Sequence, residues 1–272
     1  MQLKDVLIQN GFRFNKRFGQ NFLTDKNLLS SIVEKAGVKE GDTVVEIGCG
    51  GGTLTAAIAD KAKRVIGFEI DERLKPVLSV TLAEYKNVEI IFKDVMKTPT
   101  EEVEKMIGGK YKLVANLPYY ITTPVLMKFI EEGANLESVS VTVQEEVADR
   151  LCAKAGTAEY GAITAAVDVV GNASKIMRID RKLFYPVPNV DSAVVRIDID
   201  REKYKGVDIK KYREVVRSAF LSRRKTLVNN LMMSFKMPRA QAEEIVLSVG
   251  KDVLVRGETL TAEDFVALSE KI

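Results

Sequence analysis

The sequence contains no histidine, and this absence is the first constraint on its chemistry. Without histidine, serine–histidine and cysteine–histidine catalytic pairs are excluded, and most transition-metal sites lose their commonest ligand. The two cysteines, Cys49 and Cys152, could form at most one disulfide, and they make no cluster of the kind that holds zinc. We therefore expect a protein without a metal site that works in the reducing cytoplasm.

Long hydrophobic runs and a strong charge excess are also missing. No apolar stretch reaches the length of about 18 residues that a membrane helix needs, and the first residues lack the basic-then-apolar order of a secretion signal. The net charge is only +3, so charge alone does not indicate a nucleic-acid-binding protein. Basic residues nevertheless gather in two groups, which solvated faces would explain as well as a ligand would. The groups are Arg13, Lys16 and Arg17, and then Arg213, Arg217, Arg223, Arg224 and Lys225.

What is present is an alternation of short apolar runs and helix-like stretches between about residues 40 and 145. This order predicts a parallel sheet with helices on both faces. Two later runs are joined by a proline-rich link too short for a crossover helix, so we expect those two strands to be antiparallel. The prediction is an α/β fold with a Rossmann-like seven-stranded sheet that contains one reversed strand. Its strands are Thr43–Ile47, Arg64–Phe68, Val88–Phe92, Lys112–Ala115, Ser138–Val143, Ser174–Ile179 and Ser192–Ile199.

The pattern changes after the charged stretch Asp198–Lys205, because only helical periodicity follows. We place a domain boundary near residue 203, with a sheet domain over 1–203 and a small all-α domain over 204–272. The helices expected in the second domain are Tyr212–Leu221, Thr226–Ser234, Arg239–Leu247 and Ala262–Ile272.

A glycine-rich loop follows the first strand of the sheet and leads into a helix. Glycine lets the chain turn sharply and lets a ligand lie against the backbone. A dinucleotide-binding loop would need a glycine at position 53, where this chain has threonine. The glycines instead fall at Gly48, Gly50 and Gly52, a spacing common in folds that bind S-adenosylmethionine. A purely structural tight turn would use the same residues.

Acidic residues end the next two strands. Glu69, about twenty residues after the first glycine, is placed to accept hydrogen bonds from ribose hydroxyls, and Ile70 follows it. Asp94, followed by Val95, is placed to accept one from an adenine amino group. Either acid alone could be a helix cap. Because both stand at carboxyl ends of strands beside one glycine loop, we predict an adenosine-binding pocket.

The fourth strand ends in Asn116-Leu117-Pro118-Tyr119. The side-chain oxygen of Asn116 and the carbonyl of Leu117 are two acceptors, Pro118 directs the chain, and Tyr119 offers a flat surface for stacking. An adenine amine is a poor nucleophile because its lone pair is delocalised. Two acceptors that hold its hydrogens would aim that lone pair at a methyl donor, without a strong base. A strand-ending turn with surface aromatics is the alternative.

Four motifs resemble those of ribosomal RNA adenine dimethyltransferases, and they occur in that family's order from Arg17 to Asn230. Asn116-Leu117-Pro118-Tyr119 is similar to the signature of amino-directed adenine methyltransferases. The other three motifs are Phe18-Gly19-Gln20-Asn21-Phe22-Leu23, Phe184-Tyr185-Pro186-Val187-Pro188-Asn189-Val190-Asp191-Ser192-Ala193, and Phe220-Leu221-Ser222-Arg223-Arg224-Lys225-Thr226-Leu227.

The resemblance implies an S-adenosylmethionine-dependent enzyme that dimethylates the N6 amino groups of two adjacent adenines in the 3′-terminal hairpin of small-subunit (16S) rRNA. The substrate would be the small subunit or its precursor, and we expect the enzyme to be a monomer. By similarity, Gln20, Asn21 and Leu23 join the cofactor site, and Phe184 and Tyr119 sandwich the target base. The domain over 204–272 would bind RNA through Arg223, Arg224 and Lys225.

Two other functions fit the same motifs, and the sequence departs from the family's pattern at two positions. A large-subunit (23S) rRNA methyltransferase of the macrolide-resistance type would share the cofactor loop and the tetrapeptide, and a non-catalytic RNA-binding assembly factor could share the scaffold. Many family members have histidine where this chain has Arg17, and a proline–glycine pair near Lys154-Ala155-Gly156. Neither position belongs to the proposed methyl-transfer site.

Overall fold

The computed structural model describes residues 3–12 and 21–272. Arg13, Lys16, Arg17 and Gln20, which the sequence singles out, lie outside the described residues. The contacts divide the chain into two compact units. The first contains Met1–Ala148 and Ser174–Ile199, and the second contains Asp149–Ala173 and Asp200–Ile272.

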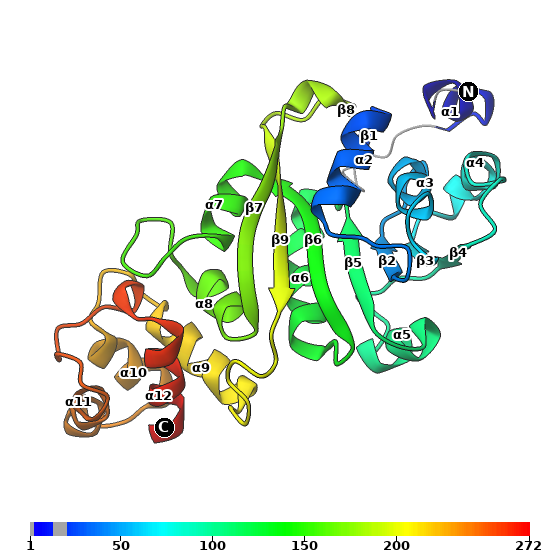
Figure 1. The fold of residues 1–272 in the computed structure, drawn as a ribbon. Coiled ribbons are helices and arrows are strands. Elements are labelled where there is room, and N and C mark those ends of the chain that lie inside the picture. The colour runs from blue at the N-terminus through cyan, green and yellow to red at the C-terminus, as the bar shows by residue number, and fades with distance from the viewer. Residues whose placement is uncertain (1–2, 13–20) are drawn as a thin grey trace. The chain divides into compact units, whose positions relative to one another are not determined.

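A seven-stranded sheet forms the centre of the first unit, in the order β4-β3-β2-β5-β6-β9-β7 (Figure 1). The pairs from β4 to β6 are parallel, whereas β9 runs antiparallel to β6. The predicted α/β fold with one reversed strand is confirmed, and the prediction placed a strand at each of the seven positions. The strands are β2 (Thr43–Ile47), β3 (Arg64–Glu69), β4 (Val88–Phe92), β5 (Tyr111–Ala115), β6 (Leu136–Gln144), β7 (Gly171–Ile179) and β9 (Ser192–Ile199).

Helices connect the strands and cover the sheet. One core cluster joins α2 and α3 to the sheet through side chains such as Leu29, Ile58 and Val65, all buried. Right-handed crossovers place helices from the two halves of such a sheet on opposite faces. The helical elements are α1 (Leu3–Gln9), α2 (Lys26–Lys35), α3 (Thr53–Ala59), η2 (Glu72–Leu74), α4 (Lys75–Thr81), α5 (Thr100–Ile107), α6 (Tyr119–Glu132), α7 (Glu145–Leu151) and η3 (Arg181–Leu183).

The strand order reverses between β2 and β5, which are neighbours although β3 and β4 lie between them in the chain. The connections on the two sides of such a reversal diverge and leave a crevice at the carboxyl ends of the strands. Gly48 follows β2 directly and Asn116 follows β5 directly. The topology therefore brings the glycine loop and the tetrapeptide together.

A second, two-stranded sheet pairs segments from opposite ends of the first unit. Antiparallel β1 (Phe22–Leu23) and β8 (Phe184–Tyr185) place Leu23 opposite Phe184 and Phe22 opposite Tyr185. The sequence does not predict this sheet, because two-residue strands carry no periodicity and the pairing joins distant segments. It brings two of the predicted site segments side by side.

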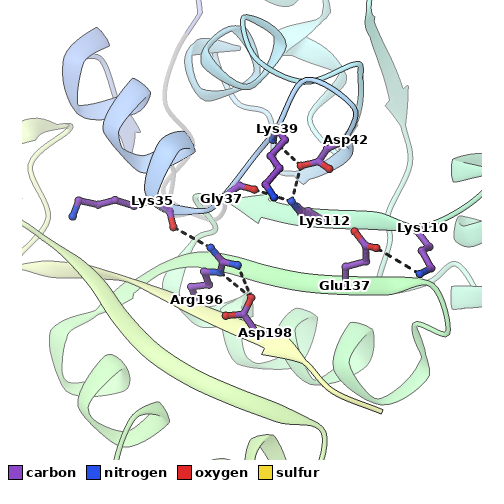
Figure 2. Close-up of polar contacts among 9 residues, drawn as sticks. All are labelled: Lys35, Gly37, Lys39, Asp42, Lys110, Lys112, Glu137, Arg196 and Asp198. Carbon is purple, nitrogen blue, oxygen red and sulfur yellow. Dashed lines mark hydrogen bonds and ion pairs between the residues drawn. The ribbon is translucent and has the colours of Figure 1, made fainter. Parts of the chain in front are cut away.

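Cations from the sheet bind the carbonyls at the C-terminal end of α2 (Figure 2). Lys112 of β5 donates to the Gly37 carbonyl at 2.7 Å and pairs with Asp42 at 2.6 Å. Arg196 of β9 donates to the Lys35 carbonyl at 3.5 Å. Positive charge at this end of a helix complements its dipole. The two cations thus join α2, which follows Asn21–Leu23, to strands β5 and β9 of the sheet.

The second unit is helical, and aromatic rings form part of its core. Tyr212 and Phe265 meet edge-to-face with centroids 6.2 Å apart, and Phe220 lies 6.1 Å from Phe265. Buried Asn230 donates to the Ala219 and Ser222 carbonyls. Its elements are α8 (Ala162–Asp168), α9 (Ile209–Ala219), α10 (Leu227–Phe235), α11 (Arg239–Ser248), η4 (Gly257–Thr259) and α12 (Ala262–Lys271). The predicted boundary near residue 203 stays a prediction about separable domains, and the contacts group 149–173 with the later helices.

No helix in the described part of the chain is both long and apolar enough to cross a bilayer.

Candidate functional site

A cavity of about 300 Å³ lies at the carboxyl ends of β2, β3, β4 and β5. Small-molecule sites have volumes in this range. Every residue predicted for the cofactor or the methyl-transfer site lines this cavity, except Gln20, which is outside the described residues. These residues are Asn21, Leu23, Gly48, Gly50, Glu69, Ile70, Asp94, Val95, Asn116, Leu117, Pro118, Tyr119 and Phe184.

The glycine loop needs glycine for both conformation and space. Gly48 and Gly50 have φ angles of 75° and 54°, in the left-handed region that glycine enters without strain. A Cβ atom at Gly50 would stand 2.7 Å from the Phe22 ring, and one at Gly51 would stand 2.4 Å from the Leu3 side chain. The segments before the sheet therefore pack directly on this loop.

Glu69 binds the glycine loop through backbone amides. Its Oε2 accepts from the Gly50 amide at 2.8 Å, and its Oε1 accepts from the Ile70 and Asp71 amides, each at 2.8 Å. Burial raises the pKa of this carboxyl group, while the three amides act in the opposite direction. A carboxylate has about four acceptor positions, so roughly one remains for a ligand. If Glu69 accepted hydrogen bonds from both hydroxyls of a ribose, one of its oxygen lone pairs would have to be shared with a backbone amide.

A second carboxyl group, Glu46 of β2, is completely enclosed and lines the same cavity. Its Oε2 has no hydrogen-bond partner among the described residues. Burial, with a further contribution from nearby Glu69, raises the pKa of Glu46 to about 8. The sequence interpretation passed over this residue, although a charge inside the buried strand Thr43–Ile47 was a signal that could have identified it.

Asp94 lies at the rim of the cavity with one quarter of its side chain exposed. Its Oδ1 accepts from the Met96 amide at 3.0 Å, and the Lys97 ammonium lies 3.7 Å from Oδ2. Ile70 is half exposed and Val95 is buried, and both line the cavity. The carboxylate keeps acceptor positions for an amino group, beside two apolar side chains.

Asn116 is oriented by the backbone of the N-terminal segment. Its amide nitrogen donates to the Asn21 carbonyl at 2.9 Å, which leaves its side-chain oxygen as the free acceptor. Leu117 is buried, and no described residue donates a hydrogen bond to its carbonyl. The two acceptors that the tetrapeptide requires are thus available, and Asn21 contributes through its carbonyl. The helix cap that follows Asn21 is Asp25, whose carboxylate accepts from the Leu28 amide.

Two aromatic rings line the cavity, on different elements. Tyr119 is the first residue of α6, and Phe184 is the first residue of β8 and is buried. The Tyr119 hydroxyl shares a 2.7 Å hydrogen bond with the Ser192 hydroxyl. Burial raises the pKa of Tyr119, so this phenol keeps its proton at neutral pH. The sequence interpretation assigned no role to Ser192 or to Phe22, because both contacts join residues far apart in the chain.

The three basic residues predicted to bind RNA belong to the second unit and differ in their contacts. Arg223 donates from one guanidinium nitrogen to the Ala158 and Tyr160 carbonyls, at 2.9 and 2.8 Å. It thereby supports the loop after Lys154-Ala155-Gly156. Arg224 and Lys225 are exposed, with the Lys225 ammonium 3.2 Å from the Met233 sulfur. Among the described residues, Arg223 is therefore the one of the three whose side chain binds backbone carbonyls.

A family model and similar sequences point to the same family of proteins. A family model described as ribosomal RNA adenine dimethylase matches residues 11–272. Proteins named ribosomal RNA small subunit methyltransferase A from Bacillus cytotoxicus and Bacillus mycoides are each 44% identical over 277 residues, which cover 99% of this chain and 94% of the relative.

Two solved structures are similar over most of the chain. A dimethyladenosine transferase from Plasmodium falciparum has a TM-score of 0.76 and 26% identity, covering 91% of this chain and 95% of that one. The 23S rRNA methyltransferase ErmE has a TM-score of 0.69 and 26% identity, covering 92% and 98%. From the matched motifs, the fold and these relatives, we conclude that this chain belongs to the ribosomal RNA adenine dimethylase family.

Proposed function

We propose that this protein uses S-adenosylmethionine to dimethylate the N6 amino groups of two adjacent adenines in 16S rRNA. Membership of the family and the 44% identity to small-subunit methyltransferases support the reaction and the substrate. The observation that carries the chemistry is the orientation of Asn116. Because its amide nitrogen donates to the Asn21 carbonyl at 2.9 Å, its oxygen is the end that remains for an amine.

The cavity fits the cofactor by its shape and by its acceptors. The glycine loop presents backbone without side chains at Gly48 and Gly50, so a ligand can approach it closely. Glu69 would hold a ribose hydroxyl, and Asp94 would hold the adenine amino group. When bound, S-adenosylmethionine supplies an electrophilic methyl group. Asn21, Leu23, Ile70 and Val95 would complete the walls of this part of the cavity.

The tetrapeptide acts on the target adenine by holding its amino group. The Asn116 oxygen and the Leu117 carbonyl accept the two amino hydrogens, which turns the nitrogen lone pair out of conjugation with the ring. Pro118 precedes α6 and directs the chain, while Tyr119 and Phe184 stack on the base after it leaves its helix. Positioning and electrostatics account for the rate enhancement. Consequently the site needs no histidine and no covalent intermediate.

The small subunit is favoured over the large subunit as the substrate. The small-subunit relatives are 44% identical to this chain, whereas the 23S rRNA methyltransferase ErmE is 26% identical. We place the enzyme with its rRNA in the cytoplasm and treat it as a monomer. Methylation of purified small and large subunits in parallel distinguishes the two substrates, since each alternative expects incorporation into only one of them.

Substitution of Asn116 by alanine tests the proposed chemistry. We expect Asn116→Ala to retain cofactor binding and to lose methyl transfer about 100-fold or more, as when one oriented polar group is removed from an active site. Labelled cofactor with small-subunit particles measures transfer, and titration of the cofactor measures binding. Asn172→Ala, at an exposed position of β7, is the control. Undiminished transfer by Asn116→Ala would contradict the assigned role.

A further inference from the structure

The hydrogen bond between Tyr119 and Ser192 has no assigned role, although it holds a ring that lines the methyl-transfer cavity. Ser192 is the first residue of β9, the reversed strand, and its side chain is completely buried. The two hydroxyl oxygens are 2.7 Å apart. This hydrogen bond favours one direction for the phenol, because the buried Ser192 hydroxyl would lose this partner if the ring turned away.

Ser192 is held in place independently of Tyr119. In the sheet it pairs with Gln144 of β6. Its neighbour Asp191 accepts from the Arg181 amide at 3.2 Å and pairs with the Arg178 guanidinium at 3.2 Å. The Asp191 carbonyl also accepts from the Glu145 amide at 3.1 Å. The position of Ser192 is therefore set by contacts that do not involve Tyr119.

Tyr119, in contrast, lies where the backbone provides little restraint. It is the first residue of α6, and the preceding Pro118 has no amide hydrogen to donate. A phenol ring on the first turn of a helix can rotate unless its far end is bound. The hydroxyl bond to Ser192 supplies that restraint, and the ring face is left for the target base.

We propose that Ser192 is a positioning residue for methyl transfer, which acts by holding the Tyr119 ring in the orientation that stacks on the target adenine. This inference rests on the proposed function. The same segment carries Phe184, because η3, β8 and the loop to β9 occupy residues 181–191. The ends of that segment are joined by the contacts of Asp191 with Arg178 and with the Arg181 amide. Both rings therefore depend on this segment for their positions, Phe184 directly and Tyr119 through Ser192.

A double-mutant cycle tests the inference. The loss of one neutral hydrogen bond corresponds to about a 3- to 10-fold effect. We expect Ser192→Ala and Tyr119→Phe each to lower kcat for small-subunit particles by about that factor, while the affinity for S-adenosylmethionine stays unchanged. The double variant should be no worse than Tyr119→Phe alone, since both substitutions remove the same bond. Additive losses would overturn the proposal.

Ser140→Ala provides the matched control for removing a buried hydroxyl from the same sheet. Ser140 lies on β6, it is buried, and its hydroxyl has no hydrogen-bond partner among the described residues. Its substitution should leave kcat unchanged. If Ser192→Ala folds poorly in thermal unfolding, Tyr119→Phe removes the bond from the other side and carries the test.

An activity-independent measurement separates this inference from the proposed function. The protein has eight tyrosines, and tyrosine labelled with ¹³C at the hydroxyl-bearing carbon gives one NMR resonance for each. Tyr119→Phe identifies the resonance of Tyr119. Ser192→Ala should shift that resonance, and Ser140→Ala should leave it in place. An unshifted resonance overturns the role of Ser192 and leaves the proposed function intact, whereas wild-type protein that fails to methylate particles overturns the proposed function on which this role rests.

Discussion

The carboxyl group of Glu46 is buried from solvent. Burial raises its pKa from an ordinary value of 4.5 to about 8. Below pH 4.5 both the folded and the unfolded chain bind the proton, so the group has no differential effect there. Between 4.5 and 8 the unfolded chain loses the proton while the folded chain keeps it, and stability falls as the pH rises through this window.

Substitution of Glu46 by glutamine should remove this pH dependence. We expect Glu46→Gln to raise the free energy of unfolding at pH 8 by on the order of 2 kcal/mol, and to change it little at pH 4.5, because the neutral amide has no proton to lose. Urea denaturation at the two pH values measures the difference. Glu159→Gln, at an exposed position, should have no such effect. Equal destabilisation at both pH values would instead mean that the folded protein holds Glu46 ionised and partnered.

Residues of the site were predictable where they form a contiguous motif or stand at the end of a predicted strand. Asn116-Leu117-Pro118-Tyr119 forms a local motif. Glu69 ends β3 and Asp94 lies just after β4, so their meeting in one cavity follows from a parallel sheet. Ser192 was not predictable, because its role depends on a single bond across the fold. Chain-distant contacts of that kind leave no periodic pattern in the sequence.

Elements were predictable to a similar extent. The prediction located all seven strands of the sheet, including the edge strands β4 and β7, which are only partly buried. Helix α6 begins at Tyr119, within the tetrapeptide that the sequence analysis treats as the end of the fourth strand. Pro124 is the sixth residue of α6 and obscured its start in the sequence, because a proline inside a helix lacks the amide that would donate to the preceding turn. The pairing of β1 with β8 has no local signal at all.

Helix α2 is bound to the sheet by Lys112 and follows the segment Asn21–Leu23 that lines the cavity. Lys112 and Asp42 have side chains only 12% and 18% exposed, and Lys112 also binds the Gly37 carbonyl. Substitution of Lys112 by methionine leaves both acceptors without their cation. We expect Lys112→Met to lower the free energy of unfolding by about 2 kcal/mol, since removal of one partner from a buried pair is costly. Urea denaturation measures this loss.

The same variant should also weaken cofactor binding, because α2 follows Asn21–Leu23, which lines the cavity. Lys110→Met is the control. Its pair with Glu137 is 3.8 Å long and mostly exposed, and such pairs contribute little. If both variants unfold at the same urea concentration as the wild type, the ion pairs in Figure 2 do not hold α2 in place.

For the whole molecule, the low net charge of +3 means that RNA binding must come from local groups of basic residues. Arg224 and Lys225 are exposed on the second unit, while Arg223 also supports the loop at 158–160. These three neighbours should therefore respond differently to substitution. Arg223→Gln should lower the thermal stability as well as the affinity for particles, whereas the other two should affect affinity alone.

Salt dependence identifies which of these residues contact phosphates. Each lost phosphate contact reduces the slope of log affinity against log salt by about 1. We expect Arg224→Gln and Lys225→Gln each to weaken binding to small-subunit particles and to lower that slope by about this amount, with cofactor affinity unchanged. Lys271→Gln, at an exposed position near the end of α12, is the control and should leave the slope unchanged. If the slope is the same for all three variants, this stretch does not contact phosphates, and the affinity for RNA must arise from other basic residues.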